Sequence, residues 1–308
     1  VLVTDLTEEI GACEQELIEL FRAKNIPYVV VRNKADLLTV RPAAGPDEVI
    51  TSTADGTGIW ELKEKIAHLV PAEDPRLHIV GDLIRPEDFI VLVVPIDSAA
   101  PKGRIILPQQ QTIRDILEGD AAALVVRETQ LASLLRDIGK KPAMVITDSQ
   151  AFGKVSKDTP EDIPLTSFSI LLARYKGYLE TAVHGVAAIE QLKDGDTVLI
   201  AEGCTHHRQC DDIGTVKIPR WLREYTKKDI KIETVSGTEY PEDLSKYAMV
   251  IHCGACMLTE REVRYRMKCA EDQGIPFTNY GITIAYLHGI LYRCLGPFPA
   301  LQAVIRPE

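Results

Sequence analysis

Two short clusters of cysteine and histidine each follow an apolar, strand-like run in this 308-residue chain. The first is a C-x-H motif after residues 197–201, and the second is an H-C-x-x-C motif after residues 247–251. Alternating strand and helix patterns surround them, which predicts a parallel α/β sheet with both motifs beyond the carboxyl ends of its strands. Thiolate and imidazole are the ligands that zinc and iron–sulfur clusters select. The sequence therefore predicts a metal site at this edge of the sheet.

The residue types leave the identity of the metal open. Cys204, Cys253 and Cys256 with one histidine would make a closed Cys₃His zinc site. The same three cysteines with a weak or exchangeable fourth ligand suit a 4Fe–4S cluster whose fourth iron stays open to chemistry. The candidates for this fourth ligand are His206, Asp211 and His252. A disulfide between Cys253 and Cys256 is the third alternative.

The segment after the second motif adds to the case for a metal. A charged amphipathic stretch runs from Thr259 to Gln273 with acidic residues in its first turn, which predicts a helix that starts just after Cys256. The N-terminus of this helix would favour the negative charge of a thiolate-ligated cluster. The small residues Gly254 and Ala255 leave room for a metal core between the two thiols.

The composition is that of a soluble globular chain, with 45% hydrophobic and 26% charged residues. A net charge of −10 without a dominant basic stripe argues against a nucleic-acid partner. No apolar run approaches the roughly 20 residues of a membrane span, and no signal-peptide pattern stands at the start, so we expect no membrane association. Seven cysteines are an odd number and too sparse for a disulfide scaffold, which favours the reducing cytoplasm.

The first 70 residues carry a second type of motif. An N-K-x-D motif formed by Asn33, Lys34 and Asp36 follows a strand-like run, and a loop with Ser52 and Thr53 precedes a predicted helix. This pair resembles the guanine-recognition elements of the small GTPase superfamily. In such a site the Asp36 carboxylate accepts two hydrogen bonds from guanine, Lys34 lies along the base, and the Ser52 loop offers backbone donors to the exocyclic oxygen.

The elements that would bind phosphate are absent from the sequence. It contains no G-x-x-x-x-G-K-[ST] motif to cradle phosphates or to place magnesium. The chain opens inside the expected nucleotide-binding domain, on what should be one of its central strands. We therefore assign no catalytic residue and do not expect these 308 residues alone to hydrolyse GTP.

The order of the predicted elements indicates three consecutive layered α/β domains with mainly parallel sheets. Residues 1–70 are the expected C-terminal part of a GTP-binding domain. Residues 78–178 show a β-α-β-α-β order without a catalytic constellation, and their apolar strand 89–96 needs cover on both faces. We expect this middle domain to mediate subunit association. Residues 179–308 carry the candidate metal ligands on a third α/β unit, which ends in a predicted helix over 282–295.

These features together resemble the HydF family of FeFe-hydrogenase maturation GTPases. The resemblance covers the whole chain apart from the N-terminal half of the GTP-binding domain. It implies a GTP-binding domain, a dimerisation domain, and an iron–sulfur domain in which Cys204, Cys253 and Cys256 hold a 4Fe–4S cluster. It also implies a homodimeric scaffold that two radical-SAM maturases load with a diiron precursor for transfer to the apo-hydrogenase. The full-length protein would bind GTP and magnesium.

Two other functional classes fit the same residues. A redox-sensing or electron-transfer iron–sulfur protein would need fast, reversible reduction at a shielded cluster rather than an open coordination position. A zinc-stabilised nucleotide-binding regulator would use the metal only to hold its fold.

Overall fold

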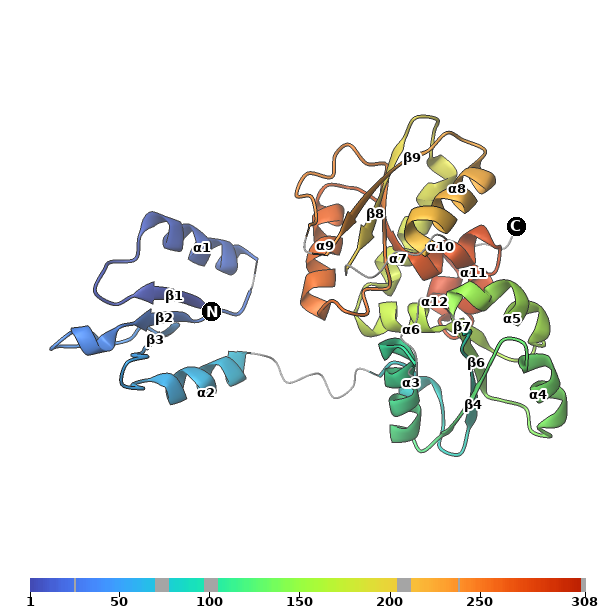
Figure 1. The fold of residues 1–308 in the computed structure, drawn as a ribbon, viewed down its shortest axis with the longest axis horizontal. Coiled ribbons are helices and arrows are strands. Elements are labelled where there is room, and N and C mark those ends of the chain that lie inside the picture. The colour runs from blue at the N-terminus through green and yellow to red at the C-terminus, as the bar shows by residue number, and fades with distance from the viewer. Residues whose placement is uncertain (25, 70–77, 97–104, 204–211, 238, 306–308) are drawn as a thin grey trace. The chain divides into compact units, whose positions relative to one another are not determined.

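A computed structural model gives the fold of the chain and describes residues 1–308 except 25, 70–77, 97–104, 204–211, 238 and 306–308 (Figure 1). The chain divides into two compact units, Val1–Leu77 and His78–Glu308. Every strand pair of the described residues is parallel, and helices flank the sheets. The predicted α/β fold class with mainly parallel sheets is therefore confirmed.

The first unit contains a three-stranded parallel sheet in the order β1-β2-β3. Its strands are β1 (Leu2–Asp5), β2 (Val30–Asn33) and β3 (Glu48–Ile50), and its helices are α1 (Ala12–Ala23) and α2 (Ile59–Leu69). The apolar side chains of Val29, Val31 and Val49 are buried in its core. Because the strands are parallel, the N-K-x-D motif at the end of β2 and the loop after β3 meet at the same edge of the sheet.

The second unit begins with a four-stranded parallel sheet in the order β5-β4-β6-β7. Its strands are β4 (Phe89–Val93), β5 (Ala122–Val126), β6 (Met144–Thr147) and β7 (Leu165–Ser167), and its helices are α3 (Leu107–Glu118), α4 (Leu131–Asp137), α5 (Phe152–Asp158) and α6 (Phe168–Tyr175). Ile90 and Val91 on opposite faces of β4 are both fully buried, as the prediction of a strand covered on both faces requires. β4 ends before Ile96 because Pro95 has no N–H to donate to the sheet.

A second four-stranded parallel sheet follows, in the order β11-β10-β8-β9. Its strands are β8 (Thr197–Glu202), β9 (Lys231–Ser236), β10 (Met249–His252) and β11 (Phe277–Asn279), and its helices are α7 (Leu179–Val186), α8 (Ile218–Thr226), α9 (Glu260–Asp272), α10 (Tyr280–Leu287), α11 (Leu291–Cys294) and α12 (Pro299–Gln302). The single terminal helix predicted over 282–295 is wrong. It is divided between α10 and α11, because Gly289 adopts a left-handed φ of 69°.

Short helical turns complete the second unit. They are the 3₁₀ turns Gly81–Leu83, Ser149–Ala151 and Ala187–Gln191 and the π-helical turn Ile213–Lys217; the first unit has one 3₁₀ turn, Ala35–Leu37. α10 packs against α6, and both sheets contribute to one apolar core that includes Val91, Val145, Val198 and Val250 (Figure 1). The residues of the two expected domains after residue 77 thus fold together as one compact body.

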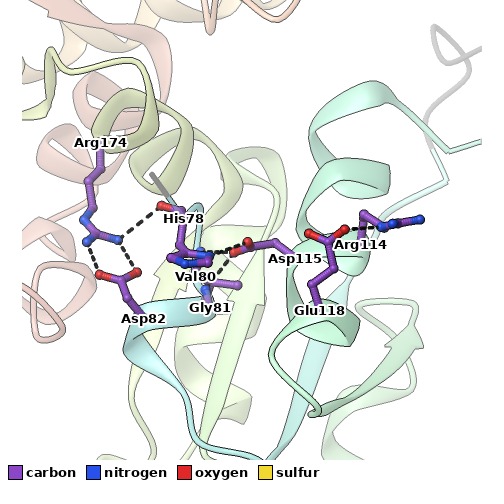
Figure 2. Close-up of polar contacts among 8 residues, drawn as sticks. All are labelled: His78, Val80, Gly81, Asp82, Arg114, Asp115, Glu118 and Arg174. Atoms are coloured by element: carbon purple, nitrogen blue, oxygen red, sulfur yellow. Dashed lines mark hydrogen bonds and ion pairs between the residues drawn. The ribbon is translucent and has the colours of Figure 1, made fainter. Parts of the chain in front are cut away.

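The start of the second unit is fastened to two of its helices, as Figure 2 shows. The Asp115 carboxylate on α3 accepts hydrogen bonds from the backbone N–H groups of Val80 and Gly81 at 2.7 and 2.6 Å. Arg174 on α6 pairs with both carboxylate oxygens of Asp82, one of them at 2.9 Å. These contacts fix the chain between the two helices before it enters β4.

Candidate metal centre

The H-C-x-x-C motif begins at His252, the last residue of β10, at the carboxyl edge of the second unit's last sheet. Cys253, Cys256 and His252 are described by the structure, whereas Cys204, His206 and Asp211 lie outside the described residues. No group of three or more metal-ligating side chains is found within the described ranges. The assignment of three cysteines to one metal therefore stays a prediction.

The sulfur of Cys253 faces backbone N–H groups from both sides of the motif. Sγ accepts a hydrogen bond from Gly203 N at 3.0 Å and one from Ala255 N at 3.4 Å. Gly203 follows β8, so this contact joins the end of that strand to the cysteine loop. The backbone N–H of Cys253 donates to the carbonyl of Ala201 at 2.8 Å. Because N–H donors stabilise the charged form of sulfur, this position favours a thiolate.

The loop between the two cysteines turns sharply and has open space beside Gly254. Ala255 adopts a left-handed φ of 55°, which turns the chain between Cys253 and Cys256. A Cβ atom built on Gly254 would meet nothing within 4 Å, so there is open space at the centre of the loop. Both cysteines are half-buried thiols and are not joined by a disulfide. Two neighbouring thiols, one of which accepts two N–H donors, fit a thiolate-ligated zinc ion or iron–sulfur cluster.

The helix predicted after the motif begins where the sequence indicates. α9 starts at Glu260, and the side chain of Thr259 caps it by accepting a hydrogen bond from Glu262 N at 3.3 Å. A Cβ on Gly203, the residue after β8, would lie 2.6 Å from Cγ of Leu258. Only glycine therefore fits at this close contact with the segment that follows Cys256. The N-terminus of α9 thus lies against the candidate site.

Lys176 reaches the same loop from the segment after α6. Its side chain is buried, and Nζ donates to the carbonyl oxygens of Ala255 and Leu258, the latter at 3.0 Å. Burial lowers the pKa of Lys176 below its usual value, whereas the neighbouring thiols of Cys256 and Cys253 raise it. This residue could not be identified from the sequence, because a single lysine beside a helix end belongs to no motif.

His252 is completely buried and has a protein partner at each ring nitrogen. Nδ1 lies 2.9 Å from the carbonyl oxygen of Cys253, and Nε2 lies 3.4 Å from a guanidinium nitrogen of Arg266. Because arginine can only donate, Nε2 is the acceptor and Nδ1 carries the hydrogen that the carbonyl accepts. Burial lowers the pKa of His252 to about 4, which keeps the ring neutral. This geometry supports a positioning role, and the assignment of His252 as fourth ligand stays a prediction.

Arg266 is the second buried cation near the loop and was also missed. Its guanidinium donates to Glu262 Oε1 and to the carbonyl of Gly237, both at 2.7 Å. It also lies over the ring of Tyr240, with 5.2 Å between Cζ and the ring centroid. Arg266 therefore ties α9 to His252 and to the end of β9.

The predicted guanine-binding residues come together in the first unit. Asn33 Oδ1 accepts a hydrogen bond from Thr53 N at 3.2 Å, and Asp36 Oδ1 accepts one from the Ser52 hydroxyl at 2.6 Å. These contacts join the N-K-x-D motif to the loop after β3. Their role in nucleotide binding stays a prediction.

Lys34 is held by an acid that sequence analysis did not select. It adopts a left-handed φ of 71°, and its Nζ lies 2.5 Å from Oδ2 of Asp5 at the end of β1. The hydrogen bond from Lys34, with further ones from Thr7, lowers the pKa of Asp5 to about 2. The lysine is thus fixed at the same sheet edge as Asn33 and Asp36.

The fold defines a parallel α/β protein whose last sheet presents a cysteine loop at its carboxyl edge. Residues 79–177 match the family described as the hydrogen maturase F dimerization domain, and residues 180–297 match the hydrogen maturase F tetramerization domain. The chain belongs to the hydrogen maturase F (HydF) family. Comparison with curated proteins found no match.

Family membership gives the chain a role in hydrogenase maturation, and the two matched domains support self-association. The tetramerization description applies to the region in which sequence analysis expected the iron–sulfur site, so association through that region was not foreseen. Within the described residues, no helix is both long and apolar enough to cross a bilayer.

Proposed function

We propose that this protein is a scaffold and carrier in FeFe-hydrogenase maturation. It binds a 4Fe–4S cluster through Cys204, Cys253 and Cys256 and holds a diiron precursor for transfer to the apo-hydrogenase. The observation that carries the proposal is the loop after β10, where Cys253 Sγ receives two N–H donors and Gly254 leaves open space. When bound, the cluster supplies an iron with an exchangeable coordination position.

The exposure of the loop favours a carrier over a shielded electron-transfer protein. Cys253 and Cys256 are half-buried, and Met257 beside them exposes 69% of its surface. A partner protein can therefore approach the site directly. His206 and Asp211 are the proposed exchangeable ligands, with His252 disfavoured because both of its ring nitrogens already have partners. The radical-SAM maturases and the apo-hydrogenase are the proposed partners at this surface.

Residues 1–70 are the proposed C-terminal part of a GTP-binding domain. Asn33, Lys34, Asp36, Ser52 and Thr53 would contact guanine, since their loops are hydrogen-bonded to each other at one sheet edge. The sequence has no phosphate-binding motif, so these 308 residues are expected to show no magnesium-dependent GTP hydrolysis. Phosphate release assayed with GTP and Mg²⁺ tests this expectation, and measurable turnover would contradict it.

The proposed homodimer forms through residues 78–178. β5 lies at an edge of the sheet formed by the described strands, and Val125 on it exposes 44% of its surface. An apolar edge strand is a template for pairing with a second copy. Val125→Glu is expected to lower the molar mass measured by light scattering, and Leu37→Glu, an exposed change in the first unit, is the control. An unchanged mass for Val125→Glu would refute this interface.

Anaerobic reconstitution with iron and sulfide tests the cluster. Wild-type protein should take up both and give an EPR signal after reduction. Alanine at Cys204, Cys253 or Cys256 should abolish uptake, whereas Cys13→Ala, which removes an exposed thiol of the first unit, should not. Full iron and sulfide in Cys253→Ala would refute the ligand set.

The same samples separate the alternative classes. Zinc in place of iron in protein purified without reconstitution would favour the zinc-stabilised regulator. Imidazole added to the reduced protein should change the EPR signal if one iron has an exchangeable ligand. A signal that stays unchanged would instead favour a redox or electron-transfer protein with a closed cluster.

A further inference from the structure

Lys176 is a buried cation whose hydrogen-bond partners are both neutral. Only 8% of the residue is exposed, and its Nζ donates to the carbonyl oxygens of Ala255 and Leu258. In the part of the chain that the structure describes, no carboxylate forms an ion pair with it. Glu260, in the first turn of α9, is paired with Arg264 at 2.6 Å. The Glu260 carboxylate acts on Lys176 only through space, without a direct ion pair. A buried ammonium without a direct ion pair is unfavourable, because carbonyl dipoles do not replace a countercharge.

Lys176 contacts the backbone on both sides of Cys256, a candidate metal ligand. Ala255 directly precedes Cys256, and Leu258 follows it by two residues, so the two acceptors flank this cysteine. The carbonyl of Lys176 in turn accepts a hydrogen bond from Arg264 Nε at 3.5 Å. The side chain of Lys176 therefore contacts the loop, and its backbone contacts α9.

We propose that Lys176 is the counter-cation of an anionic, thiolate-ligated centre on the Cys253–Cys256 loop. The inference rests on the proposed function, because it assigns the missing negative charge to the bound cluster. Three thiolates outweigh the positive charge of an oxidised 4Fe–4S core, so such a centre is an anion. The Lys176 ammonium stabilises the negative charge of this centre, and the centre supplies the countercharge that the buried ammonium lacks.

This assignment predicts that Lys176 does not stabilise the cluster-free protein but stabilises the reduced cluster in the loaded protein. In the cluster-free protein, Lys176→Met removes a buried charge that has no ion-pair partner among the described residues, so the variant should unfold at a denaturant concentration equal to or above that of wild type. In the loaded protein, reduction adds negative charge that Lys176 stabilises. Lys176→Met should therefore shift the reduction equilibrium toward the oxidised form by roughly tenfold, about 59 mV for a one-electron couple.

The experiment compares three variants with wild type after anaerobic reconstitution. Lys176→Met removes the charge and keeps an unbranched side chain, Lys176→Arg keeps the charge, and Lys268→Met removes an exposed lysine on α9 that pairs with Asp272. The measurements are EPR-monitored redox titration, iron content, and urea unfolding of the cluster-free proteins. Only Lys176→Met should lower the reduction potential, and Lys176→Arg should retain most of the wild-type value.

Each contrary result overturns the assignment. A wild-type potential in loaded Lys176→Met would show that the charge does not act on the centre. A cluster-free Lys176→Met that fails to fold would show that the polypeptide itself needs the lysine. If Lys176→Met does not bind iron, the iron content of Lys176→Arg decides. Iron bound by Lys176→Arg supports the counter-cation role, and an equal loss of iron in Lys176→Arg refutes it. Wild-type protein that takes up no iron refutes the proposed function instead, so the two failures are distinguishable.

Discussion

A guanidinium nitrogen of Arg266 on α9 lies 3.4 Å from Nε2 of His252 in the H-C-x-x-C motif, and both side chains are completely buried. The contact fixes the tautomer of His252, whose other nitrogen donates to the carbonyl of Cys253. Through this pair, α9 determines the orientation of the backbone that presents Cys253. The loop is therefore positioned by a side-chain network on one side and by Lys176 on the other.

Replacing Arg266 with Met should strongly destabilise the second unit. The change leaves Nε2 of His252, the carbonyl of Gly237 and one oxygen of Glu262 without their partner. Breaking one side of such a buried network typically costs about 3–5 kcal/mol. Urea unfolding of the cluster-free protein measures the loss. The control is Arg220→Met, an exposed change on α8, whose free energy of unfolding should stay within about 0.5 kcal/mol of wild type. An equal loss of stability in both variants would contradict the role of Arg266.

Stability should fall as the pH decreases from about 6.5 to 4. The pKa of His252 is lowered from 6.5 to about 4 in the folded protein, so in this range the unfolded chain binds a proton that the folded chain does not. The free energy of unfolding therefore decreases with falling pH, by up to about 3 kcal/mol from this group. Urea unfolding at several pH values should show a smaller decrease in His252→Gln. An identical pH dependence in the variant would show that another group is responsible.

Asp115→Ala should loosen the start of the second unit. The carboxylate accepts two backbone N–H bonds, and its loss leaves both donors of Val80 and Gly81 unsatisfied (Figure 2). We expect a loss of about 1–3 kcal/mol and faster hydrogen exchange at these two amides. Glu118→Ala, one turn along α3, breaks only an exposed ion pair with Arg114 and serves as control. Unchanged exchange at Val80 and Gly81 would refute the fastening role of Asp115.

Much of this fold follows from local sequence patterns. The β-α-β-α-β order expected in residues 78–178 is found as β4, α3, β5, α4 and β6, because apolar periodicity separates the helices from the strands. The helix just after Cys256 was also predicted, since acidic residues at the start of an amphipathic stretch are a strong local signal. β7 was missed because three residues after Pro164 are too short for any periodic pattern.

The candidate site was only half predictable, for a physical reason. The cysteines can be recognised by their spacing in the sequence. The two cations cannot, because Lys176 contacts Ala255, 79 residues away in the sequence, and Arg266 contacts Gly237, 29 residues away. In the sequence both cations look like ordinary surface residues of helical segments. Their burial is produced by tertiary packing, which local propensity does not encode.

Two glycines of the site should respond differently to the same substitution. A Cβ on Gly203 would lie 2.6 Å from Leu258, whereas a Cβ on Gly254 would meet nothing within 4 Å. Gly203→Ala should therefore displace the loop and cost about 1–3 kcal/mol in the cluster-free protein. Gly254→Ala should leave the stability of the cluster-free protein within about 0.5 kcal/mol of wild type.

Reconstitution distinguishes them further. If the space at Gly254 receives the metal group, Gly254→Ala should fold normally yet incorporate less iron. If it incorporates the full amount, the space beside Gly254 is not where the cluster lies, although the cysteine assignment would stand. Alanine keeps the backbone N–H that Gly203 donates to Cys253 Sγ. Loss of iron in Gly203→Ala with normal stability would therefore indicate that a small displacement of this donor or of Leu258 is enough to disturb the centre.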